Sequence, residues 1–138
     1  MEIEKCYEHS CGERRKPNAH GNISGKNGKI YPPDREEIGR ASWLVLHTMS
    51  ANYPTNPTEE DKKKHFHFFH AFANLYPCYI CKLDLLEHLK SYKINCEGRT
   101  EMATFMFNLH NKVNEDIGKA LFPCGHIQEI IDMYRTAD

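Results

Sequence analysis

From Tyr31 onward, apolar positions recur three and four residues apart, which is the spacing that places side chains on one face of an α-helix. The pattern predicts a first helix that runs to about Asn52 and begins at Asp34 as N-cap, with Glu37 three residues later. The expected buried positions of this helix are Ile38, Ala41, Trp43, Val45, Leu46 and Met49. No convincing strand pattern alternates with polar residues, so the sequence indicates an all-α fold.

A second helix is predicted between Thr58, which can cap it together with Asp61, and Pro77, which ends it because the residue before a proline avoids the helical region. Its broad apolar face is formed by two neighbouring stripes, Phe66, Phe69 and Ala73 beside Phe68, Phe72 and Leu75. A third helix follows from about Cys78 and directs Leu85, Leu86 and Leu89 inward.

The fourth predicted helix runs from about Thr100 to Gly118, a residue type that commonly stops a helix. Its inward positions are Met102, Met106, Leu109, Val113 and Ile117. A short fifth helix, "IQEIIDMYR", follows near the end of the chain. Residues 31–138 therefore read as one compact domain, a four-helix bundle with a short fifth helix.

Residues 1–30 differ in composition, because they are rich in Gly, Asn, Lys and Arg and poor in aliphatic residues. Such a segment buries too little apolar surface to offset the entropy of ordering, so we interpret it as a flexible arm. Cys6 and Cys11 lie on this arm with four residues between them. They are either a redox pair or two incidental thiols.

Charge and cysteine content narrow the class of protein. The net charge of −1 shows no excess of basic residues, so the sequence does not indicate binding to nucleic acid. The start of the chain, "MEIEKC", lacks the apolar stretch of a cleaved signal, and no run is long enough to span a membrane. Six cysteines in such a chain are more typical of catalysis or metal binding than of a disulfide scaffold.

The pair Cys78 and Cys81 stands at the predicted start of the third helix, where amide N–H groups and the helix dipole stabilise a thiolate. The spacing fits a redox dithiol, and it also fits half of a zinc site completed by Cys96, Cys124 or a histidine. No strand precedes the pair, which argues against a thioredoxin fold. The histidines of "HFHFFH" are better explained as polar positions between core phenylalanines than as metal ligands.

Three stretches in order resemble the Erv/ALR family of FAD-linked sulfhydryl oxidases. "PPDREEIGRASWLVLHTMSANYP" resembles the first helix of the family, "LYPCYIC" its active-site segment, and "LHNKVNEDIGKALFPC" its flavin-contacting helix and the following turn. The resemblance covers about Tyr31 to Cys124. It implies a helical bundle that binds FAD without a Rossmann fold, and it accounts for the absence of a glycine-rich phosphate loop.

The resemblance also implies roles for individual residues. Cys78 and Cys81 would be the catalytic pair, with Cys81 next to the flavin and Cys78 exchanging with incoming thiols. The residues expected to contact FAD are Gly39, Arg40, Trp43, His47, His110, Asn111, Val113, Asn114 and Lys119. Trp43 offers a flat surface for ring packing, and Arg40 or Lys119 can meet phosphate charge. No metal site is expected.

By the same resemblance, the protein would be an enzyme that oxidises thiols to disulfides, passing electrons through FAD to oxygen, which yields hydrogen peroxide, or to cytochrome c. Its substrate would be a thiol-bearing protein such as an import oxidoreductase. Cys6 and Cys11 would form a shuttle pair, the protein would be a homodimer, and it would act in the mitochondrial intermembrane space. The alternative function is a non-enzymatic helical module that binds zinc.

One departure from the family concerns the remaining cysteines. Relatives usually carry a disulfide that ends at the position of Cys124, but its other half would be Phe107 here. Cys96 precedes the fourth helix and Cys124 follows it, and a helix of this length spans about 28 Å. Because a disulfide needs Cα atoms within about 7 Å, we expect that Cys96 and Cys124 are not joined within one chain.

Overall fold

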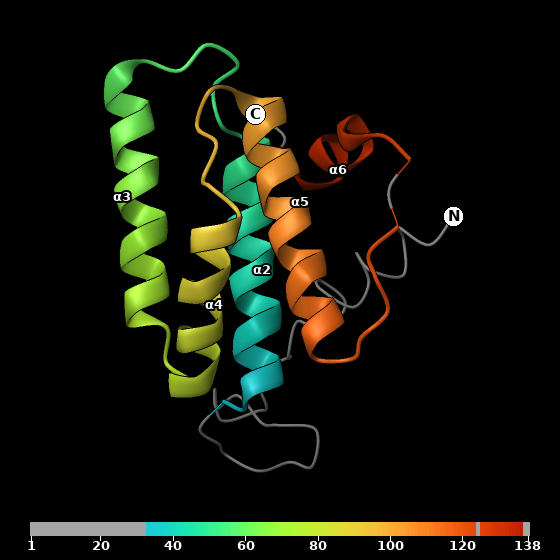
Figure 1. Cartoon of the computed structure of the whole chain (residues 1–138). Coiled ribbons are helices and arrows are strands. Elements are labelled where there is room, and N and C mark those ends of the chain that lie inside the picture. The colour runs from blue at the N-terminus through green and yellow to red at the C-terminus, as the bar shows by residue number, and fades with distance from the viewer. Residues whose placement is uncertain (1–32, 124, 137–138) are drawn as a thin grey trace, which may run out of the picture.

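The computed structural model describes residues 33–123 and 125–136. Its five helices are α2 (Arg35–Ala51), α3 (Glu59–Leu75), α4 (Tyr79–Ser91), α5 (Arg99–Asp116) and α6 (Ile127–Tyr134). The all-α prediction is confirmed, and each helix lies within a few residues of its expected position. Figure 1 shows α2 to α5 side by side with alternating direction, and α6 crossing beside α5. None of these helices has the length and apolarity needed to cross a membrane.

Local capping signals explain why the helices begin where they do. The Asp34 carboxylate accepts a hydrogen bond from the Glu37 backbone N–H at 2.9 Å. Thr58 and Asp61 form both halves of a capping box at the start of α3, with hydrogen bonds of 2.9 and 3.1 Å. Just after the C-terminal end of α5, Gly118 has a φ of 72°, a left-handed conformation that favours glycine over residues with a side chain.

Two hydrophobic clusters make up the core. The first joins α2, α3, α4 and α5, and its buried members include Leu46, Phe69, Met102 and Met106. The second joins α2, α5 and α6, with Phe122, Ile130, Ile131 and Tyr134 buried together. α2 therefore belongs to both clusters, because one side of it faces the bundle and the other faces α6.

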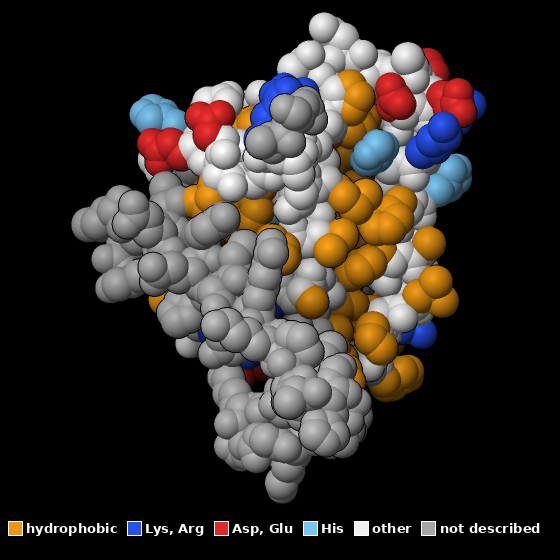
Figure 2. Space-filling view, turned by 180° about the vertical axis from the view of Figure 1, so that it is seen from behind, with side chains coloured by type: hydrophobic (Ala, Val, Ile, Leu, Met, Phe, Trp, Pro, Cys, Tyr) orange, Lys and Arg blue, Asp and Glu red, His pale blue; other side chains and the backbone are white. Residues whose placement is uncertain are grey.

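Several positions that the sequence predicted as buried are exposed instead: Ala41, Val45, Phe66, Leu75 and Ile117. On α2 the buried face includes His47 and Ser50, which are 2 and 1% exposed. Neither buried side chain is left unpaired, because His47 is hydrogen-bonded to His110 and the Ser50 hydroxyl donates to the Leu46 carbonyl oxygen. α3 packs chiefly on α4, so only the strip with Phe69 and Ala73 is fully covered. The view in Figure 2 shows hydrophobic side chains gathered on the side where α3 lies.

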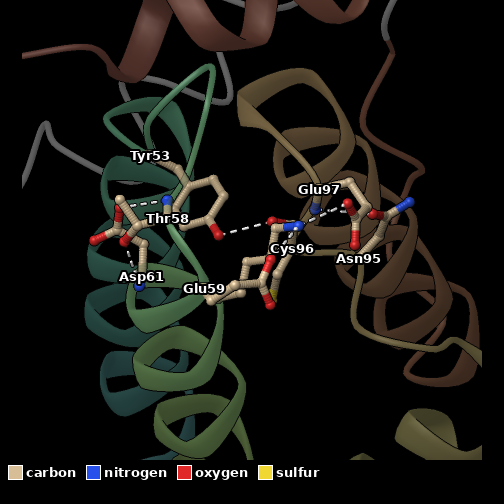
Figure 3. A network of polar contacts seen from close by, with 8 residues as sticks. Tyr53, Thr58, Glu59, Asp61, Asn95, Cys96 and Glu97 are labelled. Atoms are coloured by element: carbon tan, nitrogen blue, oxygen red, sulfur yellow. Dashed lines mark hydrogen bonds and ion pairs between the residues drawn. The ribbon is translucent and has the colours of Figure 1, made fainter.

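A polar network closes the end of the bundle opposite the α3–α4 turn (Figure 3). The buried Tyr53 hydroxyl donates to the Cys96 carbonyl oxygen at 2.7 Å, and Arg99 Nε donates to the Tyr53 carbonyl oxygen at 2.8 Å. Burial is the main reason that the pKa of Tyr53 rises to about 12. The network joins the α2–α3 connection to the α4–α5 connection. It therefore links the pair of helices α2 and α3 to the pair α4 and α5.

Candidate active site

The two cysteines of the predicted dithiol are joined to each other. Cys78 and Cys81 form a disulfide with a Cα–Cα distance of 5.3 Å, and both are partly buried. Cys78 is the N-cap residue of α4, directly after Pro77, and its side chain makes no capping hydrogen bond. The helix N-terminus would therefore stabilise a thiolate at this position if the bond were reduced. The Cα–Cα distance lies within the usual range for a disulfide, so the bond closes within one helical turn.

The segment before the disulfide packs on α2 close to the first predicted cofactor residues. A Cβ atom at Gly39 would lie 4.0 Å from the Tyr76 hydroxyl oxygen, and Tyr76 also shares a hydrogen bond with Ser42. Arg40, the next residue on α2, forms an ion pair of 2.8 Å with Glu36. The start of α2 and the start of α4 therefore lie at the same end of the bundle, as Figure 1 shows.

A pair of histidines joins α2 to α5. His47 Nε2 and His110 Nδ1 are 2.8 Å apart, so one ring donates the hydrogen bond and the other accepts it. Burial, together with the neighbouring His110, lowers the pKa of His47 to about 3. Burial and the nearby Lys119 charge lower the pKa of His110 to about 4. Both imidazoles are therefore neutral at physiological pH.

Flat rings surround the histidine pair on both sides. Trp43 lies on His110 with ring centroids 4.0 Å apart and planes 10° from parallel. Tyr134 of α6 lies on His47 at 4.8 Å, and Phe122 lies 6.4 Å from the same ring. We call these five residues, Trp43, His47, His110, Phe122 and Tyr134, the aromatic cluster. The rings of the cluster pack on one another, and its centre is a hydrogen-bonded pair of imidazoles rather than apolar side chains alone.

Phe122 and Tyr134 received no role from the sequence. The helical spacing of Ile130, Ile131 and Tyr134 does indicate one buried face of α6, and that signal could have placed Tyr134 near the core. Phe122 carries no such signal, because it lies in a connection outside any periodic pattern. Its place is set by contacts with residues distant in sequence, among them Phe107 at 6.1 Å.

Asn111, expected to contact the cofactor, holds the chain after α5 in this structure. Its amide oxygen accepts from the Phe122 N–H at 2.6 Å, and its amide nitrogen donates to the Phe122 carbonyl oxygen at 3.1 Å. The side chain thereby satisfies both backbone groups of a residue that is 5% exposed. Asn111 acts here on the backbone that carries one wall of the aromatic cluster.

The other predicted residues of α5 lie along one end of that helix. Val113 is half-buried and Asn114 is buried, and the Asn114 carbonyl oxygen accepts from the Lys119 N–H at 2.8 Å. Lys119 is exposed, yet its charge acts on His110. The structure therefore brings Trp43, His47 and His110 together, and the Lys119 charge acts on His110, whereas Arg40 is paired with Glu36 on α2.

Of the four remaining cysteines, Cys96 lies in the part of the chain that the structure describes. Cys96 is a free, buried thiol whose pKa is raised, mainly by burial, which agrees with the expectation that it is not bonded to Cys124. Cys6, Cys11 and Cys124 lie outside the described residues. Within the described part of the chain, no three His, Cys, Asp or Glu side chains gather in a way that could hold a metal ion.

Comparison with known proteins gives consistent matches. A sequence model of the Erv1 / Alr family matches residues 40–132. The mitochondrial FAD-linked sulfhydryl oxidase ERV1 of Saccharomyces cerevisiae is 38% identical over 96 residues, which are 70% of this chain and 51% of that protein. The FAD-linked sulfhydryl oxidase ERV1 of Oryza sativa is 33% identical over 74% of this chain and 53% of its own length. The chain thus spans about half the length of these curated relatives.

Solved structures match over nearly their full length. The crystal structure of the yeast Erv1 core superimposes with a TM-score of 0.69 at 36% identity, covering 73% of this chain and 86% of that one. The FAD binding domain of Erv1 from Saccharomyces cerevisiae gives a TM-score of 0.70 at 32% identity, covering 75% of this chain and 98% of that one. The family model's residues 40–132 include the disulfide and every member of the aromatic cluster except Tyr134.

Proposed function

The chain belongs to the Erv1/Alr family, and from that premise we propose that it is an FAD-linked sulfhydryl oxidase, an enzyme that makes disulfide bonds in thiol-bearing proteins. The observation that carries the proposal is the disulfide between Cys78 and Cys81 at the N-terminus of α4. It is an oxidised pair, partly buried, in a helical domain that resembles a known FAD binding domain.

The reaction follows from thiol–disulfide exchange. A substrate thiolate attacks Cys78 Sγ, the bond to Cys81 breaks, and Cys81 leaves as a thiolate. A second substrate thiolate then attacks the substrate sulfur of this mixed disulfide, so the substrate disulfide forms and Cys78 leaves as a thiolate. The electron pair now resides on Cys78 and Cys81, and the helix N-terminus favours the charged form of the sulfur released there.

The aromatic cluster supports the binding of a planar cofactor. Trp43 and His110 are planar rings that suit contact with a heteroaromatic ring, His47 is hydrogen-bonded to His110 beneath them, and Arg40 and Lys119 can meet phosphate charge. Trp43 and His110 are already face to face at 4.0 Å, so a ring could lie between them only if they separated. Trp43, His47, His110, Arg40 and Lys119 would hold FAD, which would supply an acceptor for the electron pair of the dithiol and a route for it to oxygen, yielding hydrogen peroxide, or to cytochrome c.

The place of action and the partners are finer points of the same proposal. Relatives from Saccharomyces cerevisiae and Schizosaccharomyces pombe carry the word mitochondrial in their names, which supports a mitochondrial location for this chain. We place it in the intermembrane space with an oxidoreductase-like thiol protein as substrate, and assign Cys6 and Cys11 as the pair that shuttles electrons to Cys78.

We also propose a homodimer. The exposed apolar residues Val45 of α2 and Phe66 of α3, at 51 and 46%, support contact with a second copy of the chain through these helices. Sedimentation equilibrium of the purified protein tests this, because a monomer at all micromolar concentrations would contradict it.

Purification decides between the oxidase and the zinc-binding alternative. We expect a yellow protein with a flavin absorption spectrum, about one FAD per chain, and oxygen-dependent oxidation of dithiothreitol. A colourless protein that carries stoichiometric zinc and leaves dithiothreitol reduced would overturn the oxidase proposal.

A further inference from the structure

The helix that carries the disulfide has few apolar anchors. No residue of α4 is fully buried, and its contacts with the hydrophobic core come from Leu85 and Leu89. The same two side chains line a small apolar cavity between α4 and the other helices of the bundle, so they do not fill the space beneath the helix. Side chains that border a void lose part of their packing contacts. Apolar contacts alone therefore do not fix the position of α4.

One polar contact joins α4 to α5, which lies beside it in Figure 1. His88 Nε2 is 2.7 Å from Asp116 Oδ2, and the His88 side chain is only 12% exposed. Within the described residues, no other hydrogen bond or ion pair connects a side chain of α4 to another helix. Lys90, for example, pairs with Glu87 of α4 itself at 3.1 Å. The contact between His88 and Asp116 is thus the one directional link from α4 to α5 in this part of the chain.

Asp116 stands at a position that its own helix disfavours. It is the last residue of α5, where the negative end of the helix dipole repels a carboxylate. Its partner on α5 is Lys112 at 3.4 Å, and a lysine four residues before an acidic residue is the less favourable order of the two charges. His88, by contrast, lies in the last turn of α4, where the dipole favours a positive charge. The contact with α4 therefore explains Asp116 better than α5 does.

Each of the two residues shares a helix face with a residue of the proposed site. His88 follows Cys81 by seven residues, or two turns, so both side chains leave α4 on the same side, about 10 Å apart along the axis. Asp116 follows Val113, a proposed cofactor residue, by three residues or about one turn. The contact therefore joins the side of α4 that carries Cys81 to the side of α5 that carries Val113.

We propose that His88 and Asp116 are positioning residues for electron transfer from the dithiol to FAD. By holding α4 on α5, they keep the Cys81 sulfur at a fixed distance and direction from the cofactor. The dithiol loses two electrons and two protons as its disulfide forms again. FAD takes up both electrons and one proton, and the other proton goes to solvent. This inference rests on the proposed oxidase function and identifies the contact that sets the geometry of its internal step.

The first test measures the internal step by itself. Anaerobic stopped-flow mixing of the FAD-loaded protein with saturating dithiothreitol gives the limiting rate of flavin reduction. His88→Ala and Asp116→Ala should each lower this rate about tenfold at unchanged FAD content, because a small misplacement of reacting groups slows a reaction strongly. Asp116→Asn keeps an oxygen that accepts from His88, so it should retain most of the rate. Wild-type rates in both alanine variants, or losses that only follow FAD content, would overturn the proposal.

Lys90→Ala is the matched control. It breaks an exposed ion pair that lies entirely within α4, so flavin reduction should keep the wild-type rate. A spectroscopic readout complements the rates. In a Cys78→Ser background, the Cys81 thiolate in contact with oxidised flavin should give a long-wavelength charge-transfer absorbance, and adding His88→Ala should weaken it per bound FAD. An absorbance that His88→Ala leaves unchanged would contradict the positioning role.

A last measurement needs neither cofactor nor turnover. Amide hydrogen exchange of the protein without added FAD should be about tenfold faster for α4 in His88→Ala and Asp116→Ala than in wild type or Lys90→Ala, whereas α2 should exchange as in wild type. Equal exchange of α4 in all four proteins would overturn this inference and leave the oxidase proposal intact. A colourless wild-type protein that does not oxidise dithiothreitol would overturn both the oxidase proposal and the electron-transfer role.

Discussion

The aromatic cluster and α4 use apolar side chains in opposite ways. In the cluster, His47, His110 and Tyr134 are held by stacking and by a hydrogen bond across helices that are distant in sequence. On α4, Leu85 and Leu89 hold the helix to the core, and Tyr79, Ile80 and Leu83 are left facing outward. A region that must keep a cofactor benefits from fixed, buried contacts, whereas the helix end that must exchange thiols with other proteins has to remain accessible. Variants in each region separate these two roles.

The largest effect is expected at the disulfide. Cys81→Ser removes the only partner to which Cys78 is bonded, so dithiol oxidation should fall to the uncatalysed rate. Because the aromatic cluster lies on α2, α5 and α6 and the connection before α6, FAD content measured by absorbance should stay at the wild-type level. Normal turnover of dithiothreitol by this variant would contradict the assignment of Cys81.

The second prediction concerns pH and the buried histidines. Because the pKa of His47 is lowered to about 3 in the folded state, the unfolded chain binds a proton at higher pH than the folded chain does. Its contribution to stability is therefore full above about pH 6.5 and is lost as the pH falls below that value. For His47 the loss from pH 7 to pH 5 is about 2 kcal/mol, and His110 acts in the same direction.

Urea unfolding at pH 7 and pH 5 measures this loss. The His47→Gln variant should show a smaller difference between the two pH values than wild type. His67→Gln, at an exposed position of α3, is the control and should follow wild type. A free energy of unfolding that does not change between pH 7 and pH 5 would argue against neutral buried imidazoles.

The third prediction concerns Asn111. Asn111→Ala leaves the buried N–H and C=O groups of Phe122 without their side-chain partner, which should cost about 1–3 kcal/mol in the free energy of unfolding. FAD retention should fall as well, because Phe122 forms one wall of the aromatic cluster. Asn108→Ala, exposed on the same helix, should stay within about 0.5 kcal/mol of wild type. Equal stability of the two variants would remove the positioning role.

The smallest effect is expected from the proposed shuttle pair. Cys6→Ser combined with Cys11→Ser should leave oxidation of dithiothreitol unchanged, because a small dithiol can reach Cys78 directly. Oxidation of a reduced, unfolded protein should slow several-fold, followed by the loss of free thiols over time. If both substrates reacted at wild-type rates, the shuttle role would be excluded.

Local signals made the helices predictable. Thr58 with Asp61, Asp34 with Glu37, Pro77 and Gly118 act through neighbours in sequence, and the structure places helix ends at or beside each of them. The exposure of Val45 and Phe66 could not be predicted in the same way. Helical periodicity shows which residues share a face, but it does not show which part of a broad apolar face a neighbouring helix covers.

The candidate site shows the same difference between features set by local sequence and features set by tertiary packing. The sequence by itself determined the cysteine pair at a helix start, because three-residue spacing and a preceding proline are local facts that bring both sulfurs within reach. Only the tertiary structure decided that His47 meets His110, that Tyr134 stacks on His47, and that Asn111 bonds to the Phe122 backbone. These contacts join residues between 11 and 87 positions apart, and their partners are set by how α2, α5 and α6 pack.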